Sequence, residues 1–277
     1  MKGVLLVVLF FFVSIIISLF NPLGGVLVSD EIRMVFSFTS FLFGILSGFF
    51  IASLWDRFTK IRTLISKESA FLEDIYKFFE LADKDVAKRI AEKIDRYIIK
   101  AQEYDLHLYQ EKIGEEYSDI FEELGNLKQE GLSKTLTNRI IALTVEFTET
   151  RKEILSRGKD KLGIFHWTVL VFLAGLTIYI WLYIQFEGLF GIIIGTVLIF
   201  SIFAVITIIY DLNNLTWGTE RMDVEIYEKV YDEMGMARYY PEECLDEVKI
   251  PKEIDEYRVG YLNPETGERD VEKVKNE

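Results

Sequence analysis

Apolar and polar residues are grouped in large blocks along the 277-residue chain, and four of the apolar blocks contain no charged side chain. These blocks are residues 4–20, 34–55, 164–186 and 188–210. Each comes close to the roughly 20 residues that a helix needs to span a bilayer. The pattern therefore predicts an all-α membrane protein with four transmembrane helices.

The first apolar block has two interpretations, because Lys2 precedes it as a basic residue precedes the apolar core of a signal peptide. The block is long, however, and no convincing small-x-small cleavage pattern follows it. We therefore expect a retained helix. The single cysteine, Cys244, excludes an intramolecular disulfide and gives no support for a secreted disulfide framework.

The basic residues near the ends of the blocks predict the orientation. The connection between the first two blocks contains only Arg33, and the one between the last two contains no Lys or Arg. The middle segment is basic at both ends, with Arg57, Lys60, Arg62 and Lys67, and with Arg151, Lys152, Arg157, Lys159 and Lys161. By the positive-inside rule, both termini and this segment are cytoplasmic. We expect a multi-pass protein of the cell membrane.

The second apolar block is expected to belong to a helix that continues into the cytoplasm. No proline occurs between Arg33 and Leu81, and the only glycines there, Gly44 and Gly48, lie inside the apolar block. At 1.5 Å per residue, one uninterrupted helix over this stretch would be roughly 75 Å long. A weak break is indicated by the polar residues 83–85.

The rest of the middle segment is predicted to form a cytoplasmic helical bundle. Apolar residues recur there every three or four positions, which indicates amphipathic helices. The stripes consist of Ile90, Ile94, Tyr97, Ile98 and Ala101, of Ile113, Tyr117, Ile120, Leu124 and Leu127, and of Leu132, Leu136, Ile140, Leu143 and Phe147. Gly114, Gly125 and Gly131 indicate breaks between them. Such helices cover their stripes against one another or against a neighbouring subunit.

The C-terminal tail carries most of the negative charge. Residues 211–277 contain 9 basic and 19 acidic residues, a balance of −10 within a total of −13. An acidic tail is repelled by phosphate backbones, which argues against nucleic acid as a partner. It is either a solvated acidic tail or a partner-binding segment.

Within this tail we expect one helix and a small hairpin. Thr219 is placed to cap a helix over about 220–234, with Gly235 as its stop. Further on, YRVGYLNPETGERDVEKV shows alternation around an Asn-Pro-Glu-Thr-Gly turn. The expected domains are therefore residues 1–56 (two transmembrane helices), 57–163 (cytoplasmic helical domain), 164–210 (two more transmembrane helices) and 211–277 (acidic cytoplasmic tail).

A stripe of small residues marks one side of the second transmembrane helix: Ser37, Ser40, Gly44, Ser47 and Gly48. Such a stripe either lines a water-filled path between subunits or permits close packing of helices in lipid. If the helix lines a pore, Arg33 stands at one mouth, and Arg57, Lys60 and Arg62 at the other, where repeated subunits would form basic rings that attract anions. The alternative is that these residues only set the topology, and the neighbouring Asp30, Glu31 and Asp56 favour this alternative.

Metal and enzyme chemistry find little support. His107 and His166 are the only histidines, one in the middle segment and one in an apolar block, so a two-histidine ligand set is not expected. An acidic cluster, Glu115, Glu116, Asp119, Glu122 and Glu123, has the ligand type for calcium but no loop of fixed spacing, which favours a solvated helix face. Walker, dinucleotide-binding and nucleophile-elbow patterns are missing. We expect no metal, cofactor or catalysis.

The order of these parts resembles the bestrophin-like membrane proteins of prokaryotes. The resemblance rests on two apolar spans, the segment SLWDRFTKIRTLISKESAFLEDIYKFFELA (residues 53–82), a helical insert, two more spans and then YDLNNLTWG (residues 210–218). Glu68 and Ala70 match the Glu-Ala-like pair of the family, and Asp211 matches the aspartate at the end of its fourth span. Tyr210 and Asn213 depart from that pattern, and Trp217 and Gly218 come later than it expects.

The resemblance implies a homopentameric anion channel whose second transmembrane helix lines the pore and forms a narrow apolar neck. By this resemblance, the pore-lining candidates are Ser37, Ser40, Phe41, Gly44, Ser47 and Ile51. The expected partners are other copies of the chain, membrane lipid and small inorganic ions. The rival hypothesis is a non-conducting membrane-anchored sensor or scaffold that binds a protein through its cytoplasmic helices and acidic tail.

Overall fold

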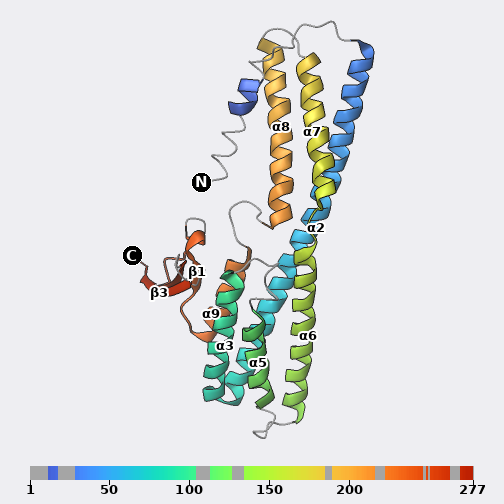
Figure 1. Cartoon of the computed structure of the whole chain (residues 1–277). Helices are drawn as coiled ribbons and strands as arrows, with labels where there is room; N and C mark the ends of the chain where they lie inside the picture. Colours follow the sequence, from blue (N-terminus) through green and yellow to red (C-terminus); the bar gives the residue numbers. More distant parts are fainter. Residues whose placement is uncertain are drawn as a thin grey trace. The chain divides into compact units, whose positions relative to one another are not determined.

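A computed structural model describes residues 12–17, 29–103, 113–126, 134–184, 189–215, 222–245, 248, 250–262 and 269–276 (Figure 1). Its helices are α2 (Asp30–Ala82), α3 (Lys84–Glu103), α5 (Gly114–Asn126), α6 (Lys134–Lys159), α7 (Ile164–Ile184), α8 (Leu189–Asn214) and α9 (Met222–Met234). A short 3₁₀ helix, η2 (Glu242–Cys244), and the strands β1 (Tyr239–Pro241), β2 (Glu256–Leu262) and β3 (Arg269–Lys275) follow. Residues 12–17 are also helical.

The chain divides into two compact units, each built from two separate stretches of sequence. The apolar unit comprises Met1–Phe58 and Lys161–Thr219, and the polar unit comprises Thr59–Asp160 and Glu220–Glu277. The polar unit thus contains residues of both the middle segment and the tail.

Three of the described helices, α2, α7 and α8, are long and apolar enough to cross a membrane. They contain the expected spans 34–55, 164–186 and 188–210, apart from residues 185–188, which lie outside the described residues. Of the expected first span, 4–20, only the helical residues 12–17 are described, so a fourth transmembrane helix stays a prediction.

Helix α2 is one continuous helix of 53 residues, as the absence of proline predicts. It ends at the polar break foreseen near residue 83. There, the Asp83 carboxylate accepts hydrogen bonds from the backbone N–H groups of Asp85 (2.8 Å) and Val86 (3.4 Å). Asp83 therefore caps α3, because its side chain satisfies N–H groups that have no partner within the first turn of a helix.

In the apolar unit, one face of α2 packs inside the protomer. Phe43, Phe50 and Leu54 are buried there at helical spacing. The ring of Phe36 lies 5.8 Å from that of Trp181 on α7, and Phe50 lies edge-on to His166 at 5.6 Å between ring centroids. Figure 1 shows α7 and α8 alongside this part of α2. One histidine of the sequence is therefore an aromatic packing residue.

The polar unit has a helical core formed by the stripes that the sequence predicts. All five residues of the first stripe are buried on α3, and Ile113, Ile120, Leu143 and Phe147 of the other two are buried as well. Leu124, Leu127, Leu132, Leu136 and Ile140 lie outside the residues whose side chains are described. The helical bundle follows from this periodicity, because each helix hides its apolar face against the others.

Helix α9 ends at Gly235, as expected. Gly235 has φ +63°, a left-handed conformation that glycine adopts without steric cost. Its N–H bonds to the Asp232 carbonyl (3.2 Å), and the Met236 N–H bonds to the Tyr231 carbonyl (3.0 Å), the two bonds of a Schellman motif. The proposed cap, Thr219, lies outside the described residues.

The predicted hairpin is present, because β2 and β3 pair antiparallel with Gly260 opposite Val271. Its turn, 263–267, lies outside the described residues. The sequence did not predict β1, which pairs parallel with β2 and completes a three-stranded sheet in the order β1-β2-β3. A three-residue strand ending in proline has too few alternating positions to be recognised in advance.

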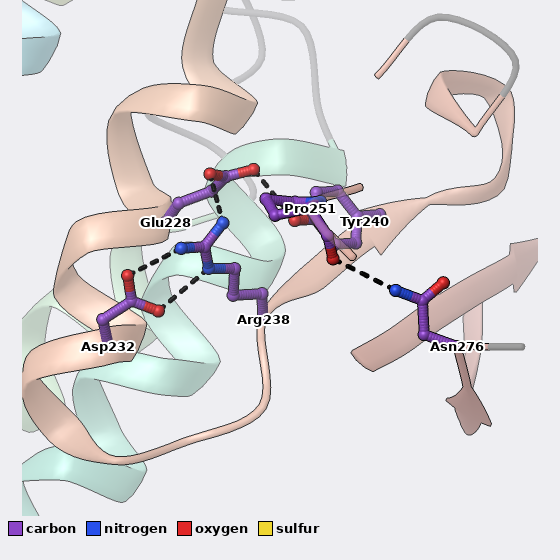
Figure 2. A network of polar contacts seen from close by, with 6 residues as sticks. All are labelled: Glu228, Asp232, Arg238, Tyr240, Pro251 and Asn276. Carbon is purple, nitrogen blue, oxygen red and sulfur yellow. Dashed lines mark hydrogen bonds and ion pairs between the residues drawn. The ribbon is translucent and has the colours of Figure 1, made fainter. Parts of the chain in front are cut away.

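Polar contacts fix the beginning of this sheet to α9 (Figure 2). The Arg238 guanidinium bonds to both carboxylate oxygens of Asp232 (2.9 and 2.7 Å) and to Glu228. Tyr240 donates its hydroxyl to the other Glu228 oxygen at 2.8 Å. Near the end of the chain, the Asn276 amide donates to the Pro251 carbonyl at 3.1 Å. A large part of the acidic tail is thus folded and internally paired.

Candidate functional site

The candidate site is the apolar part of α2, whose two faces have different surroundings in the protomer. Ser37, Phe41, Gly44 and Gly48 are exposed, and their spacing of four, three and four residues places them on one face. The opposite face is buried against the rest of the apolar unit. Large apolar side chains are exposed on α2 as well, among them Phe38, Ile45 and Phe49. The exposed side of the helix is therefore available to lipid, to another copy of the chain or to water.

The six pore-lining candidates do not share one environment. Ser37, Phe41 and Gly44 are exposed, Ser40 and Ile51 are half-buried, and Ser47 is buried with an exposed fraction of 4%. Sequence spacing alone groups Ser40 and Ser47 with the others, because small residues at intervals of three and four cover a broad arc of a helix. Contacts with the neighbouring helices decide which residues of this arc are exposed and which are buried.

Two serine hydroxyls on α2 differ from several other hydroxyls of the apolar unit in their hydrogen bonding. Thr39 donates its hydroxyl to the Val35 carbonyl at 2.8 Å, and Thr177 and Ser201 make the same type of bond within their own helices. The hydroxyl oxygens of Ser40 and Ser47 are buried and have no hydrogen-bond partner among the described residues. A buried hydroxyl without a partner is unfavourable, so both would gain from a water molecule.

Gly44 and Gly48 are not required for packing inside the protomer. A Cβ atom built on either residue meets nothing within 4 Å. Since glycine costs roughly 1 kcal/mol relative to alanine within a helix, its presence here needs a reason outside the protomer. Close approach of a second helix and a lumen that must stay wide are both such reasons.

The four predicted pore-mouth charges also differ. Arg33 is exposed and lies 3.9 Å from Asp30, and Lys60 and Arg62 are exposed on the part of α2 that belongs to the polar unit. Arg57 is instead buried in the apolar unit, with 7% exposed, and donates to the backbone carbonyl of Asn213 at 3.1 Å. The burial of Arg57 and its bond to Asn213 therefore indicate that Arg57 positions α8.

Asn213 joins three segments of the apolar unit. Its carbonyl accepts the Arg57 bond, and its side-chain Oδ1 accepts the backbone N–H of Leu162 at 2.7 Å. Arg57 lies on α2, Asn213 on the last turn of α8, and Leu162 just before α7. The cation also satisfies a carbonyl at the negative end of α8. Asn213, which departs from the family pattern, is thus the residue that connects these helices. Its position in YDLNNLTWG, at the end of an apolar block, is the only sign of this role in the sequence.

Glu68, one of the two residues that match the Glu-Ala-like pair, is fully buried in the polar unit. It accepts hydrogen bonds from the hydroxyls of Tyr97 on α3 and Tyr227 on α9, the latter at 3.1 Å. Burial raises the pKa of the Glu68 carboxyl, while these two hydroxyls and the charge of Arg151 oppose the rise. Glu68 therefore links α2 with two other helices. Ala70, by contrast, is exposed.

The acidic cluster of α5 is engaged in ion pairs with α3. Glu116 pairs with Lys100 (2.7 Å), Glu123 with Arg89 (2.8 Å) and Lys93 (3.3 Å), and Asp119 lies 3.9 Å from Arg96. These carboxylates hold two helices together instead of forming only a solvated face. Among the described residues, which exclude His107, no group of three or more His, Cys, Asp or Glu side chains is arranged to hold a metal ion.

Fold and site together define an α-helical membrane protein with a helical second unit joined to it through one long helix. The sequence matches the Bestrophin-like domain over residues 4–215. Since this match covers most of the chain, the protein belongs to the Bestrophin-like family.

Solved structures have the same fold at low sequence identity. A single-residue variant of a bacterial Bestrophin homologue from Klebsiella pneumoniae superposes with a TM-score of 0.68 at 11% identity, over 83% of this chain and 99% of that one. Another variant of that homologue gives 0.64 at 14% identity, over 84% and 97%. A variant described as a membrane protein gives 0.64 at 13% identity, over 85% and 98%. A comparison with curated protein sequences found no match.

Proposed function

We propose that this chain is the subunit of a homo-oligomeric ion channel that conducts anions, with α2 lining the pore. The observation that carries the proposal is the exposed stripe of Ser37, Phe41, Gly44 and Gly48, which no part of the described protomer covers. Membership of the Bestrophin-like family supports it. The proposal reduces the six sequence candidates to a narrower set, because Ser47 is turned into the protomer.

The proposed mechanism is passive conduction along the repeated α2 helices. Serine hydroxyls at Ser37 would replace part of the hydration of a passing ion, and a ring of Phe41 side chains would form a hydrophobic constriction that closes by dewetting. Gly44 and Gly48 would leave the path wide. Outside the apolar part, Lys60 and Arg62 are exposed cations that would raise the local anion concentration.

Topology and stoichiometry belong to the same proposal. Four transmembrane helices, with both termini and the polar unit in the cytoplasm, satisfy the positive-inside rule. A pentamer is the assembly that the family resemblance favours. The proposal places the basic residues of α2 nearer to the path of the anions than the acidic tail, so that their attraction outweighs the repulsion by the tail.

Purified protein in liposomes provides the direct test. Chloride and potassium fluxes are measured beside the oligomer mass, and the proposal expects an oligomer with chloride flux larger than potassium flux. Potassium flux alone would keep a channel but contradict anion selectivity. A monomer or dimer without flux of either ion would contradict the channel and favour the membrane-anchored sensor or scaffold.

A second test identifies the face of α2 that meets water. Each of Ser37, Phe41, Gly44 and Ser47 is replaced by cysteine in a Cys244→Ala background, and a charged thiol reagent is added to the liposomes. Modification should block flux at Ser37→Cys, Phe41→Cys and Gly44→Cys and leave Ser47→Cys unaffected. Block at Ser47→Cys alone would show that the opposite face of the helix lines the pore.

A further inference from the structure

A cavity of about 400 Å³ lies within the polar unit, where the end of α2, the first half of α3 and the residues after α9 come together. All of its lining residues belong to this unit, and none lies in an apolar block. Its volume falls within the range typical of small-molecule sites. The cavity is therefore separate from the proposed pore-lining stripe.

The floor of the cavity is apolar. Ala87 and Ala91, one turn apart on α3, are buried, and their small side chains leave the space open. Met234 and Met236 line the same cavity from the end of α9. Methionine side chains are flexible and polarisable, so they adapt to apolar groups of different shapes.

The rim is charged and contains both signs. Lys84 and Lys88 lie one turn apart on α3, Glu92 follows after another turn, and Glu80 stands on the last turn of α2. Successive positions in this row on α3 are about 6 Å apart along the helix axis. Tyr76 adds a hydroxyl, whose pKa is raised first by burial and then by Glu80 and Glu233, so this hydroxyl remains a donor at neutral pH.

These rim charges differ from the other charges of α3. Four basic residues on another part of its surface, Arg89, Lys93, Arg96 and Lys100, all have carboxylate partners on α5. Lys84, Lys88, Glu80 and Glu92 form no ion pair with any residue that the structure describes. All four side chains are exposed, so the charges of this row are accessible to a ligand.

We infer that this cavity binds a small zwitterion with an apolar side chain, the chemical class of a free hydrophobic amino acid. The ligand carboxylate pairs with Lys84 and Lys88, and its ammonium group pairs with Glu92. Its side chain lies on Ala87, Ala91 and the methionines. Charge-assisted contacts of this kind are stronger than neutral ones, so each ligand charge contributes to affinity. The inference does not depend on ion conduction.

Calorimetric titration of the full-length protein in detergent tests the inference, with L-leucine as the probe. Three analogues remove its charges: leucinamide retains only the cation, N-acetylleucine only the anion, and N-acetylleucinamide neither. L-leucine should bind saturably, and every analogue should bind about tenfold more weakly or worse, because a hydrogen bond between charged groups is lost. No saturable binding of L-leucine, or N-acetylleucine binding as tightly, would overturn the inference.

Variants locate the site. Lys88→Gln and Glu92→Gln change exposed side chains, so both proteins should fold, and each should weaken L-leucine binding about tenfold. Ala91→Leu should abolish binding by filling the floor. Lys152→Gln, at an exposed position on α6, is the matched control and should bind as the unmodified protein does. Unchanged affinity in Lys88→Gln and Glu92→Gln would place the binding elsewhere.

Discussion

Arg258 on β2 forms a bidentate ion pair with Asp95 on α3, with nitrogen–oxygen distances of 2.8 and 2.6 Å. Both side chains are mostly buried, with 11% and 12% exposed. The guanidinium also lies over the ring of Tyr231 on α9, 5.3 Å from its centroid. Together with the Arg238 contacts to α9, this ion pair fixes the C-terminal sheet to the helices of the polar unit. Because both charged groups are mostly shielded from water, each depends on the other as its partner.

Removing one member of this pair should destabilise the polar unit. Asp95→Ala leaves the Arg258 guanidinium buried without its carboxylate, and breaking a buried pair costs about 3–5 kcal/mol. The expected result is a lower free energy of unfolding and faster proteolysis of the sheet, measured by denaturant titration in detergent and by limited digestion. Lys273→Ala, which removes an exposed contact with Glu256 at 3.9 Å, is the control and should change little. Equal effects of both variants would contradict this role.

Gly260 should not tolerate a side chain. A Cβ atom at this position of β2 would overlap the Tyr239 hydroxyl and lie 2.7 Å from its Cζ. Tyr239 has little room to move, since it is buried and its hydroxyl donates to Glu103 at 3.1 Å. Gly260→Ala should therefore lower the free energy of unfolding by about 1–3 kcal/mol, the usual cost of overpacking.

Gly114→Ala, in the same unit, is the matched control for Gly260→Ala. A Cβ atom added at Gly114, the first residue of α5, meets nothing within 4 Å. This variant should therefore keep the stability of the unmodified protein. Thermal melting in detergent compares the two variants, and a Gly260→Ala protein that melts like the unmodified chain would show that the sheet adjusts freely.

The buried Glu68 should make stability depend on pH. Its pKa in the folded protein is raised by burial above the ordinary value of 4.5, so between these two values the folded state binds more protons than the unfolded state. Its contribution to the free energy of unfolding should therefore fall as pH rises from about 4.5 through the folded-state pKa. Denaturant titrations from pH 4 to pH 8 measure this slope.

Glu68→Gln isolates this contribution, because glutamine does not titrate. Its amide oxygen accepts a hydrogen bond from one of the two hydroxyls, Tyr97 or Tyr227, and its NH2 group donates to the oxygen of the other. The pH slope should become flatter in this variant. Glu68→Ala should instead cost about 1–3 kcal/mol at every pH, since both hydroxyls lose their acceptor. A slope that is identical in the unmodified protein and in Glu68→Gln would assign the pH dependence to other groups.

Arg57 should act on stability more than on ion selectivity. Arg57→Ala removes the bond to the Asn213 carbonyl and should cost about 1.5–3 kcal/mol, measured as a lower melting temperature in detergent. The exposed Arg62 provides the contrast: Arg62→Glu should melt normally and lower chloride flux in liposomes. Reduced chloride flux in Arg57→Glu, which the sequence alone predicts, would be informative about selectivity only if this protein also melts normally.

The residues on which the proposals rest differ in how local their sequence signal is. The pore-lining candidates Ser37 and Gly44 stand out along the chain because their spacing marks a face of a helix, whereas Phe41 is a candidate only through the family resemblance. Asp95 had a weaker signal, a carboxylate inside the buried stripe of α3, but its partner Arg258 lies 163 residues away. Nothing along the chain joins such a pair, since the distance between them is set by the packing of α3 against the sheet.

The sequence by itself determined the helices of this protein, because apolar periodicity, the absence of proline in α2, the Asp83 cap and the Gly235 stop all act within a few residues. It determined the β2–β3 hairpin for the same reason. The tertiary structure alone decided which face of α2 is buried, that Arg57 meets Asn213, and that β1 joins the sheet beside β2. These outcomes depend on the rotation of each helix and the docking of each strand, which contacts between distant segments select.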